Sequence, residues 1–161
     1  MIQIRTFQPG DELPLLAVFR SSVRQIAAAD YTPEQLNAWA PEKLDREVWK
    51  NRITANRPFV AELDGRIVGF ADVQPTGSVD TFFVAGDAPR RGIGRALMER
   101  IFLEAAEQGI VELTSHVSLT AQPFFAKFGF EVVEHRLREL RGQVLPYALM
   151  RRNVAGTVPV P

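Results

Sequence analysis

The sequence predicts a mixed α/β domain in which one β-sheet carries helices on both faces. Stretches that alternate apolar and polar residues, as strands do, are interspersed with stretches whose apolar residues recur every three to four positions, as on one side of a helix. The dipeptide Asp64-Gly65 stands between two strand-like stretches and is typical of a β-hairpin turn. A Gly-x-Gly sequence marks the point where an apolar strand passes directly into a helical pattern.

Length and composition fit a single domain. The chain has 161 residues, of which 46% are hydrophobic, and its formal net charge is zero. No overall field therefore attracts nucleic acid or an anionic membrane, and no apolar run is long enough to span a bilayer. Cysteine is absent, which excludes disulfides and thiolate metal sites, and no metal-ligand spacing is found among the other side chains. The N-terminus lacks the apolar core of a signal peptide, so we expect a cytoplasmic protein.

The first half of the chain predicts a strand, three helices and a hairpin. Asp11 is a candidate N-cap for a helix whose apolar stripe continues to Ala27. The sequence from Thr32 to Gln35 has the pattern of a capping box, with proline at the first helical position. The elements expected here are a strand at 2–7, helices at about 12–27, 33–39 and 44–55, and strands at 59–63 and 66–73.

The centre of the chain predicts an anion site. Residues 79–84 read as an apolar strand, and residues 90–95, Arg-Arg-Gly-Ile-Gly-Arg, lead directly into a helix that ends at Gln108-Gly109. The first amides of a helix have no partner within it and lie at the positive end of its dipole, which favours a phosphate. Gly92 and Gly94 leave room for the anion, and Arg90, Arg91 and Arg95 add positive charge.

The last third predicts a strand at 110–117, a short helix at 119–128 and two strands, at about 133–140 and 144–152, around the turn Arg141-Gly142. Residues 154–161 have no periodicity and are expected to form a flexible tail. We therefore expect one domain over residues 1–153.

Two motifs in this order resemble those of the GNAT superfamily of acyl-CoA-dependent N-acyltransferases. The segment Val84 to Leu97 is similar to the family's pyrophosphate motif, Arg/Gln-x-x-Gly-x-Gly/Ala, and residues 118–130 are similar to Asn-x-x-Ala-x-x-x-Tyr-x-Lys-x-Gly-Phe. The resemblance implies a GNAT-like α/β fold, with a mostly antiparallel sheet whose middle strands splay apart. It also implies acetyl-CoA as co-substrate and transfer of its acetyl group to a primary amine of a small molecule or peptide, with no metal.

The resemblance assigns cofactor-binding roles to residues of both motifs. The backbone of the strand before the glycine turn would hold the pantetheine and the acetyl carbonyl, and the turn would hold the diphosphate. The residues implied are Phe82, Phe83, Val84, Arg90, Arg91, Gly92, Ile93, Gly94, Arg95, Ser118 and Phe125. The chain departs from the motifs at three of its positions: Pro89 replaces Arg/Gln, Ser118 replaces Asn, and Phe125 replaces the tyrosine that protonates the departing thiolate in many members.

Asp80 is the first candidate for the general base. An acid inside an apolar strand holds a proton more readily than in water, which suits proton abstraction near neutral pH. Because Phe125 has no hydroxyl, we expect either that water or the hydroxyl of Tyr31 or Tyr147 protonates the thiolate, or that the thiolate leaves unassisted. Ser118, whose hydroxyl can bind a ligand or water, is a further catalytic candidate. His116 and His135 lie on strand faces that read as solvent-exposed, and we rank them lower.

Asp30, Tyr31 and Trp39 are the candidates for the acceptor site, with Tyr147 as a further wall, because a carboxylate such as Asp30 would attract a cationic amine. Two other functions remain open. One is a non-catalytic acyl-CoA-binding or regulatory module, and the other is a nucleotide-binding domain that uses the same glycine turn. The sequence is compatible with a monomer or a homodimer.

Overall fold

The computed structural model describes residues 1–88 and 91–155, and its elements follow the expected order. They are β1 (Ile2–Thr6), α1 (Glu12–Ser21), the π-helical turn η1 (Ser22–Ile26), the 3₁₀ turn η2 (Ala27–Ala29), α2 (Pro33–Trp39), α3 (Arg46–Asn56), β2 (Phe59–Leu63), β3 (Arg66–Ala71), β4 (Ser78–Val79), β5 (Phe82–Val84), α4 (Ile93–Gln108), β6 (Glu112–Ser118), α5 (Gln122–Lys127), β7 (Glu131–Leu140) and β8 (Gln143–Asn153).

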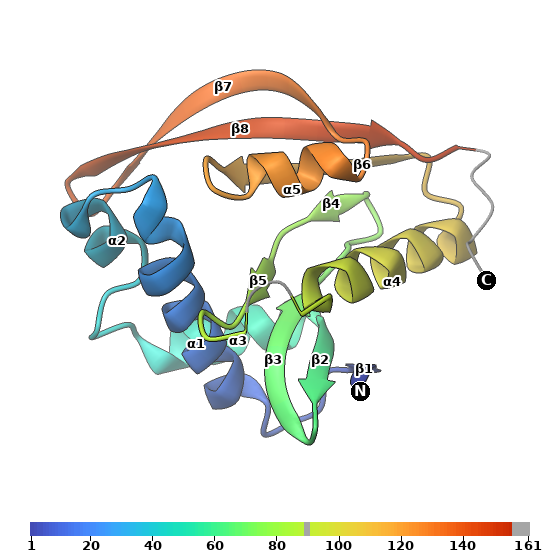
Figure 1. Cartoon of the computed structure of the whole chain (residues 1–161), viewed down its shortest axis with the longest axis horizontal. Coiled ribbons are helices and arrows are strands. Elements are labelled where there is room, and N and C mark those ends of the chain that lie inside the picture. The colour runs from blue at the N-terminus through green and yellow to red at the C-terminus, as the bar shows by residue number, and fades with distance from the viewer. Residues whose placement is uncertain (89–90, 156–161) are drawn as a thin grey trace.

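The strands form two four-stranded sheets rather than the one sheet that the residues alone predict. The first has the order β1-β2-β3-β5 and is antiparallel throughout. The second has the order β4-β6-β8-β7, and its only parallel pair among the described residues is β4 with β6. Figure 1 shows the chain descending from β4, beside the second sheet, to β5, beside the first. The mostly antiparallel, splayed arrangement that the family resemblance implies is thus confirmed.

The expected strand at 79–84 is divided by this splay. Val79 pairs with Ser115 of β6, whereas Phe83 pairs with Phe70 of β3. Between them, the side chain of Asp72 accepts hydrogen bonds from the backbone N–H groups of Asp80 (2.9 Å) and Thr81 (3.1 Å). A buried carboxylate therefore accepts the N–H groups of these two residues at the point where the strand changes sheets.

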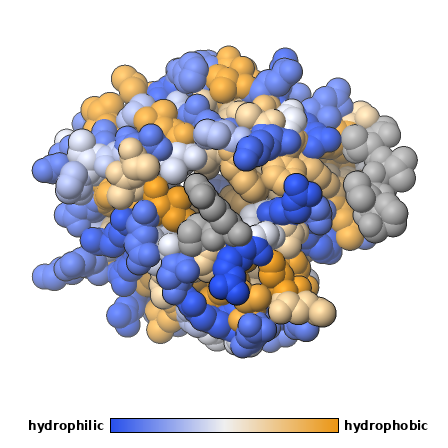
Figure 2. All heavy atoms as spheres, viewed as in Figure 1, coloured by the Kyte–Doolittle hydropathy of each residue, from blue (hydrophilic) through white to orange (hydrophobic). Residues whose placement is uncertain are grey.

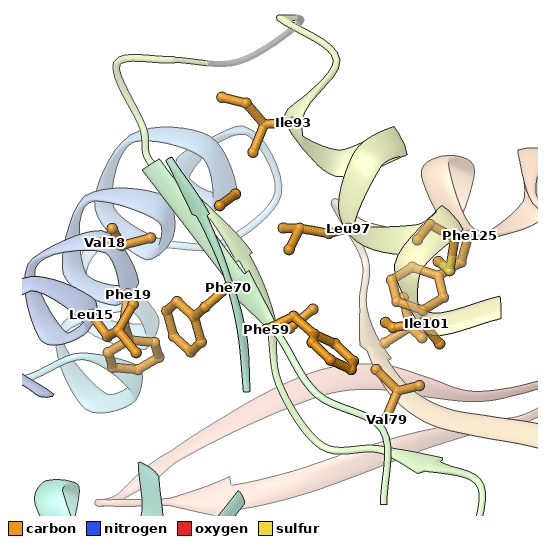
Figure 3. Packing of buried hydrophobic residues seen from close by; sticks show 14 of the residues in the cluster. Leu15, Val18, Phe19, Phe59, Phe70, Val79, Ile93, Leu97, Ile101 and Phe125 are labelled. Atoms are coloured by element: carbon orange, nitrogen blue, oxygen red, sulfur yellow. The ribbon is translucent and has the colours of Figure 1, made fainter. Parts of the chain in front are cut away.

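The first sheet is covered on both faces, as expected. In Figure 3, Val18 and Phe19 of α1 lie on one side of it, and Leu97 of α4 lies on the other. A Cβ atom added at Gly69 of β3 would lie 3.0 Å from the Cγ2 atom of Ile93, so α4 packs directly against the strand. This close packing fixes the start of α4 beside β5.

The second sheet carries the long hairpin of β7 and β8, whose turn residues Arg141 and Gly142 both have positive φ. Three side-chain hydrogen bonds join this hairpin to α2 and the segment before it: Tyr31 to the Pro146 carbonyl, Gln35 to the Val144 carbonyl, and Arg141 to the Ala38 carbonyl. The hairpin and α2 thereby become one wall of the space between the sheets.

Two local details differ from the sequence expectation. The first helix ends at Ser21 and continues as the turns η1 and η2, and Asp11, although it is the N-cap residue, directs its carboxylate to Arg5 instead of the helix. Burial of Val154 and a hydrogen bond from its N–H to the Val111 carbonyl show that the chain is still packed there. Residues 156–161 of the expected tail lie outside the described part of the chain.

No helix in the described residues combines the length and the apolar character needed to cross a membrane.

Candidate functional site

Two cavities lie on either side of the splay and meet at its centre. The larger has a volume of about 480 Å³ and runs along β5, the start of α4 and α5. The smaller, of about 310 Å³, lies between α2, α3 and the β7–β8 hairpin. The residues that line both are Trp39, Asp80, Phe83, His116 and Ser118. We call the two the larger and the smaller cavity below.

The glycine turn opens into the larger cavity. Gly92 is the N-cap of α4 with φ +80°, a conformation that favours glycine, and no side chain caps the helix. The first hydrogen bond of α4 is that from the Ala96 N–H to the Gly92 carbonyl (3.0 Å), so the N–H groups of Ile93, Gly94 and Arg95 precede the helical ladder. These donors lie at the positive end of the dipole, an arrangement that favours an anion.

Gly94 has a second role besides exposing its amide. A Cβ atom at this position would lie 2.9 Å from the ring of Phe124, so the absence of a side chain lets α4 approach α5. The anion site and the second sequence motif are thereby brought together at one end of the larger cavity.

Most of the cofactor-binding residues expected from the sequence line this cavity. They are Phe82, Phe83, Val84, Gly92, Ile93, Gly94, Arg95, Ser118 and Phe125. Arg91 is exposed and does not line it, and Arg90, like Pro89, lies outside the described residues. The positive charge supplied by the described side chains therefore comes from Arg95 and, at the end of α5, Lys127.

The second motif contributes a hydrophobic wall and an unexpected polar atom. Phe125 is buried and packs against Phe82 and Phe130, with ring centroids 5.5 and 5.0 Å apart. The Oγ1 atom of Thr120 is buried and has no hydrogen-bond partner among the described residues. Thr120 lines the larger cavity, so its hydroxyl is free to bind a ligand there. Sequence reasoning passed over this threonine because it occupies a variable position of the motif.

Asp80 lies where the two cavities meet, but in different surroundings from those expected. It is exposed and stands between β4 and β5, outside both strands. Its Oδ2 atom accepts hydrogen bonds from the amide of Asn56 (2.6 Å) and the guanidinium of Arg52 (3.3 Å). The expectation of an acid enclosed in an apolar strand is therefore wrong, and α3 is the element that orients this carboxylate.

The enclosed acid is Asp72, which sequence reasoning missed. It is 1% exposed, and its Oδ2 atom accepts hydrogen bonds from the hydroxyl of Thr81 (2.6 Å) and the amide of Asn56 (3.2 Å). Burial raises the pKa of Asp72, while the hydrogen bonds from Thr81 and from the Asp80 backbone act in the opposite direction. Since Asn56 also donates to Asp80, Asp72 holds both the backbone and, through Asn56, the side chain of Asp80.

Ser118, Tyr147 and His116 form a polar strip along the second sheet. Ser118 at the end of β6 pairs with Tyr147 of β8, and the Tyr147 ring lies 5.3 Å from that of His116. Ser118 and His116 line both cavities, whereas Tyr147 lines only the smaller one. His116 is exposed, as its strand parity predicts, but its exposed face lines the cavities.

The acceptor-site residues expected from the sequence separate into two groups. Tyr31 and Trp39 line the smaller cavity, and their rings are in edge contact at 5.6 Å. The Tyr31 hydroxyl donates to the Pro146 carbonyl (2.6 Å) and accepts from the Leu119 N–H (3.0 Å), and burial raises its pKa. Tyr31 therefore joins three segments that bound the site. Asp30 is exposed and lines neither cavity, so the structure does not bring it to the site.

The described residues contain no group of three or more His, Cys, Asp or Glu side chains able to hold a metal ion. The walls of both cavities are largely aromatic and aliphatic, and hydrophobic residues reach the molecular surface in patches between charged ones (Figure 2).

Comparisons with known proteins agree with the motifs. Residues 27–150 match the model of the acetyltransferase (GNAT) domain. Over 141 residues, 88% of this chain and 89% of its relative, the sequence is 36% identical to the uncharacterized N-acetyltransferase YafP of Escherichia coli (strain K12). A GCN5-related N-acetyltransferase structure from Rhodopseudomonas palustris is 29% identical, with a TM-score of 0.89 over 94% of both chains. PaiA N-acetyltransferase from Thermoplasma acidophilum, solved with coenzyme A, shares the fold at 22% identity, with a TM-score of 0.72 over 95% of this chain and 99% of that one.

Proposed function

The chain belongs to the acetyltransferase (GNAT) family, and from this we propose that it transfers the acetyl group of acetyl-CoA to a primary amine of a small molecule or peptide by direct attack. The observation that carries the proposal is the meeting of two cavities at Asp80, Phe83 and Ser118. A two-substrate transfer needs such a junction, because the reacting atoms must be aligned within a few ångströms.

The larger cavity has the features that acetyl-CoA requires. The first amides of α4 match a diphosphate, the phenylalanine-lined wall matches an apolar chain, and the hydroxyl of Thr120 is available to a polar group of that chain. β5 is the outer strand of its sheet, so the backbone groups of Phe82 to Val84 that do not bond to β3 are available to an extended ligand. Acetyl-CoA would supply the activated acetyl thioester.

The smaller cavity holds the acceptor in this proposal. Its amine nitrogen forms a C–N bond to the acetyl carbonyl carbon while the C–S bond breaks. One proton must leave the amine and another must reach the departing thiolate. We assign the first transfer to the Asp80 carboxylate, which Asn56 and Arg52 orient at the junction.

We assign the second transfer to a proton from solvent water relayed by the hydroxyl of Ser118, which takes up a proton from water as it gives its own to the thiolate; Tyr147 lies opposite it in the neighbouring strand. His116 is a second candidate for the base, because it also lines both cavities and a neutral imidazole nitrogen can accept a proton.

Replacement of Gly94 tests the cofactor site. Gly94→Asp places a carboxylate among the first amides of α4 and a Cβ atom against the Phe124 ring, so binding of coenzyme A should weaken by at least about 100-fold. Gly94→Asn is the matched control, because it adds the same bulk without the charge and should weaken binding less. Calorimetric titration with coenzyme A measures both, and circular dichroism shows whether each variant is folded. Wild-type affinity in Gly94→Asp would contradict the proposal.

Release of free thiol from acetyl-CoA with a panel of primary amines separates this function from the alternatives. A non-catalytic acyl-CoA-binding module would bind coenzyme A and release no thiol with any amine, and a nucleotide-binding domain would bind ATP or NAD in preference to coenzyme A. A single domain over residues 1–153, a cytoplasmic location, and a monomeric or homodimeric state without nucleic-acid or membrane partners stay proposals that rest on the sequence.

A further inference from the structure

We propose that the acceptor carries an anionic group, such as a carboxylate, on an apolar body that also bears the primary amine. This inference rests on the proposed function and specifies the substrate class of the smaller cavity. Its basis is the charge of the lining. Arg52, Arg138 and Arg141 line the cavity, and Asp80 is the only carboxylate among the described residues that does so.

The single negative charge is already matched by a positive one. The guanidinium of Arg52 lies 3.3 Å from the carboxylate of Asp80. Once this pair is set aside, two arginines remain, and the cavity carries an excess of positive charge that its aromatic walls do not screen. A polyamine or a lysine-rich peptide would bring its additional positive charges into this field and would be repelled.

The two remaining arginines differ in what they bind. Arg141 donates from Nη1 to the Ala38 carbonyl at 2.7 Å, so part of its guanidinium is engaged in holding the hairpin turn to α2. Arg138 has no hydrogen-bond or ion-pair partner among the described residues, and it lines the cavity from β7. Its guanidinium is therefore free to form a charge-assisted, two-point hydrogen bond with a carboxylate.

The sheet register places Arg138 at a distance from Ser118 that a compact acceptor could span. Ser118 of β6 pairs with Tyr147 of β8. Arg138 of β7 pairs with Leu145, which precedes Tyr147 by two residues in β8. With ordinary strand spacing and rise, the Cα atoms of Ser118 and Arg138 are on the order of 12 Å apart. An extended arginine side chain covers about half of this span, so a compact acceptor reaches from the junction to the guanidinium.

The walls of the smaller cavity indicate the chemistry of the part of the acceptor that lies between its amine and its carboxylate. Aromatic and aliphatic side chains together form most of the lining; the aromatic residues are Phe19, Tyr31, Trp39, Trp49, Phe83 and Tyr147. A volume of about 310 Å³ fits a single ring with short substituents better than a folded peptide. The acceptor class is thus an amine with an aromatic or branched apolar body and a carboxylate.

Binding of matched ligand pairs tests this inference. The probes are para-aminomethylbenzoate against benzylamine, and phenylalanine against phenethylamine, so that each pair differs only in the carboxylate. The chain has two tryptophans, Trp39 and Trp49, and both line the cavity, so tryptophan fluorescence reports occupancy without turnover. In at least one pair we expect the carboxylate-bearing member to bind about ten-fold more tightly or better, with a preference that shrinks as salt is added.

The variant Arg138→Glu tests whether Arg138 is the residue that binds the carboxylate of the ligand. It should reduce the affinity ratio of the preferred pair to about one or below, because the new carboxylate repels that of the ligand. Arg151→Glu makes the same charge change at an exposed position of the same sheet that lines neither cavity, and the ratio should persist. Equal affinities in both pairs, preference for the uncarboxylated amines, absence of binding by all four probes at millimolar concentration, or an unchanged ratio in Arg138→Glu would each overturn the inference.

The same experiments distinguish a wrong acceptor class from a wrong proposed function. If benzylamine and phenethylamine are both acetylated as well as their carboxylate-bearing partners, the acetyltransferase assignment stands and the acceptor class is wrong. If coenzyme A does not bind and no amine releases thiol, the proposed function itself fails.

Discussion

Asp72 and Asp80 show how two carboxylates of one segment take different roles. Asp72 is buried and receives its hydrogen bonds from the backbone of residues 80–81, the Thr81 hydroxyl and Asn56. Asp80 is exposed to the cavities and shares the Asn56 amide. An enclosed acid with its hydrogen bonds satisfied suits a structural role, whereas an oriented acid at the junction of the two cavities suits proton transfer.

Asp80→Asn keeps the size of the side chain and removes its capacity to take a proton. We expect turnover to fall by about 100-fold or more, with the affinity for coenzyme A within about two-fold of wild type. Steady-state thiol release over a pH series, together with calorimetric titration, measures both.

Asp87→Asn is the control for this variant, because Asp87 is an exposed aspartate paired with Arg66 and lines neither cavity. It should leave turnover unchanged. Wild-type turnover in Asp80→Asn would remove Asp80 as the base and would direct attention to His116.

At the scale of elements, local patterns predicted most of the architecture. The capping box at Thr32, the turns at Asp64-Gly65 and Arg141-Gly142, and the helix that begins after the glycine turn are all present, because each depends on residues close in sequence. The glycine turn at the start of α4 is present as well, and its role as an anion site stays a prediction.

What local patterns could not predict depends on contacts between distant residues. The division of the strand at 79–84 requires Asp72, the residue directly after β3, and a change of partner from β6 to β3. The surroundings of Asp80 depend on α3, and the use of His116 as a cavity wall depends on where the splay opens. Composition and periodicity do not predict these contacts between residues that are distant in the sequence.

Tyr31→Phe tests the contacts between elements that bound the smaller cavity. The Tyr31 hydroxyl joins the Leu119 N–H, before α5, to the Pro146 carbonyl of β8. Its removal leaves two backbone groups without a partner in a largely buried place, so the free energy of unfolding should fall by about 1–3 kcal/mol. Urea denaturation measures this change.

Tyr147→Phe is the matched control, because the other tyrosine is half-buried and its hydroxyl lacks this bridging position. It should change the free energy of unfolding by less than about 0.5 kcal/mol. A stability of Tyr31→Phe equal to that of wild type would show that the bridge does not hold the walls together.

At the scale of the molecule, one core spans both sheets although their ladders are separate. The buried cluster runs from Leu15 and Trp49, beside the first sheet, through Leu97 and Ile101 of α4 to Phe125 and Met150, beside the second. The splay thus opens two cavities at the surface without dividing the interior. A continuous core of this kind favours cooperative unfolding.

We therefore predict that both sheets unfold in one transition and that coenzyme A stabilises them together. Trp49, buried against Phe19 and Phe70, reports on the core beside the first sheet, while far-ultraviolet circular dichroism reports on the whole chain. The urea midpoints from the two signals should coincide. Coenzyme A at about 100 times its dissociation constant should raise the free energy of unfolding by about 2.7 kcal/mol by both signals. A fluorescence change that precedes the loss of secondary structure, or a ligand effect confined to one signal, would show that the sheets are separate folding units joined only through Asp80 and Thr81.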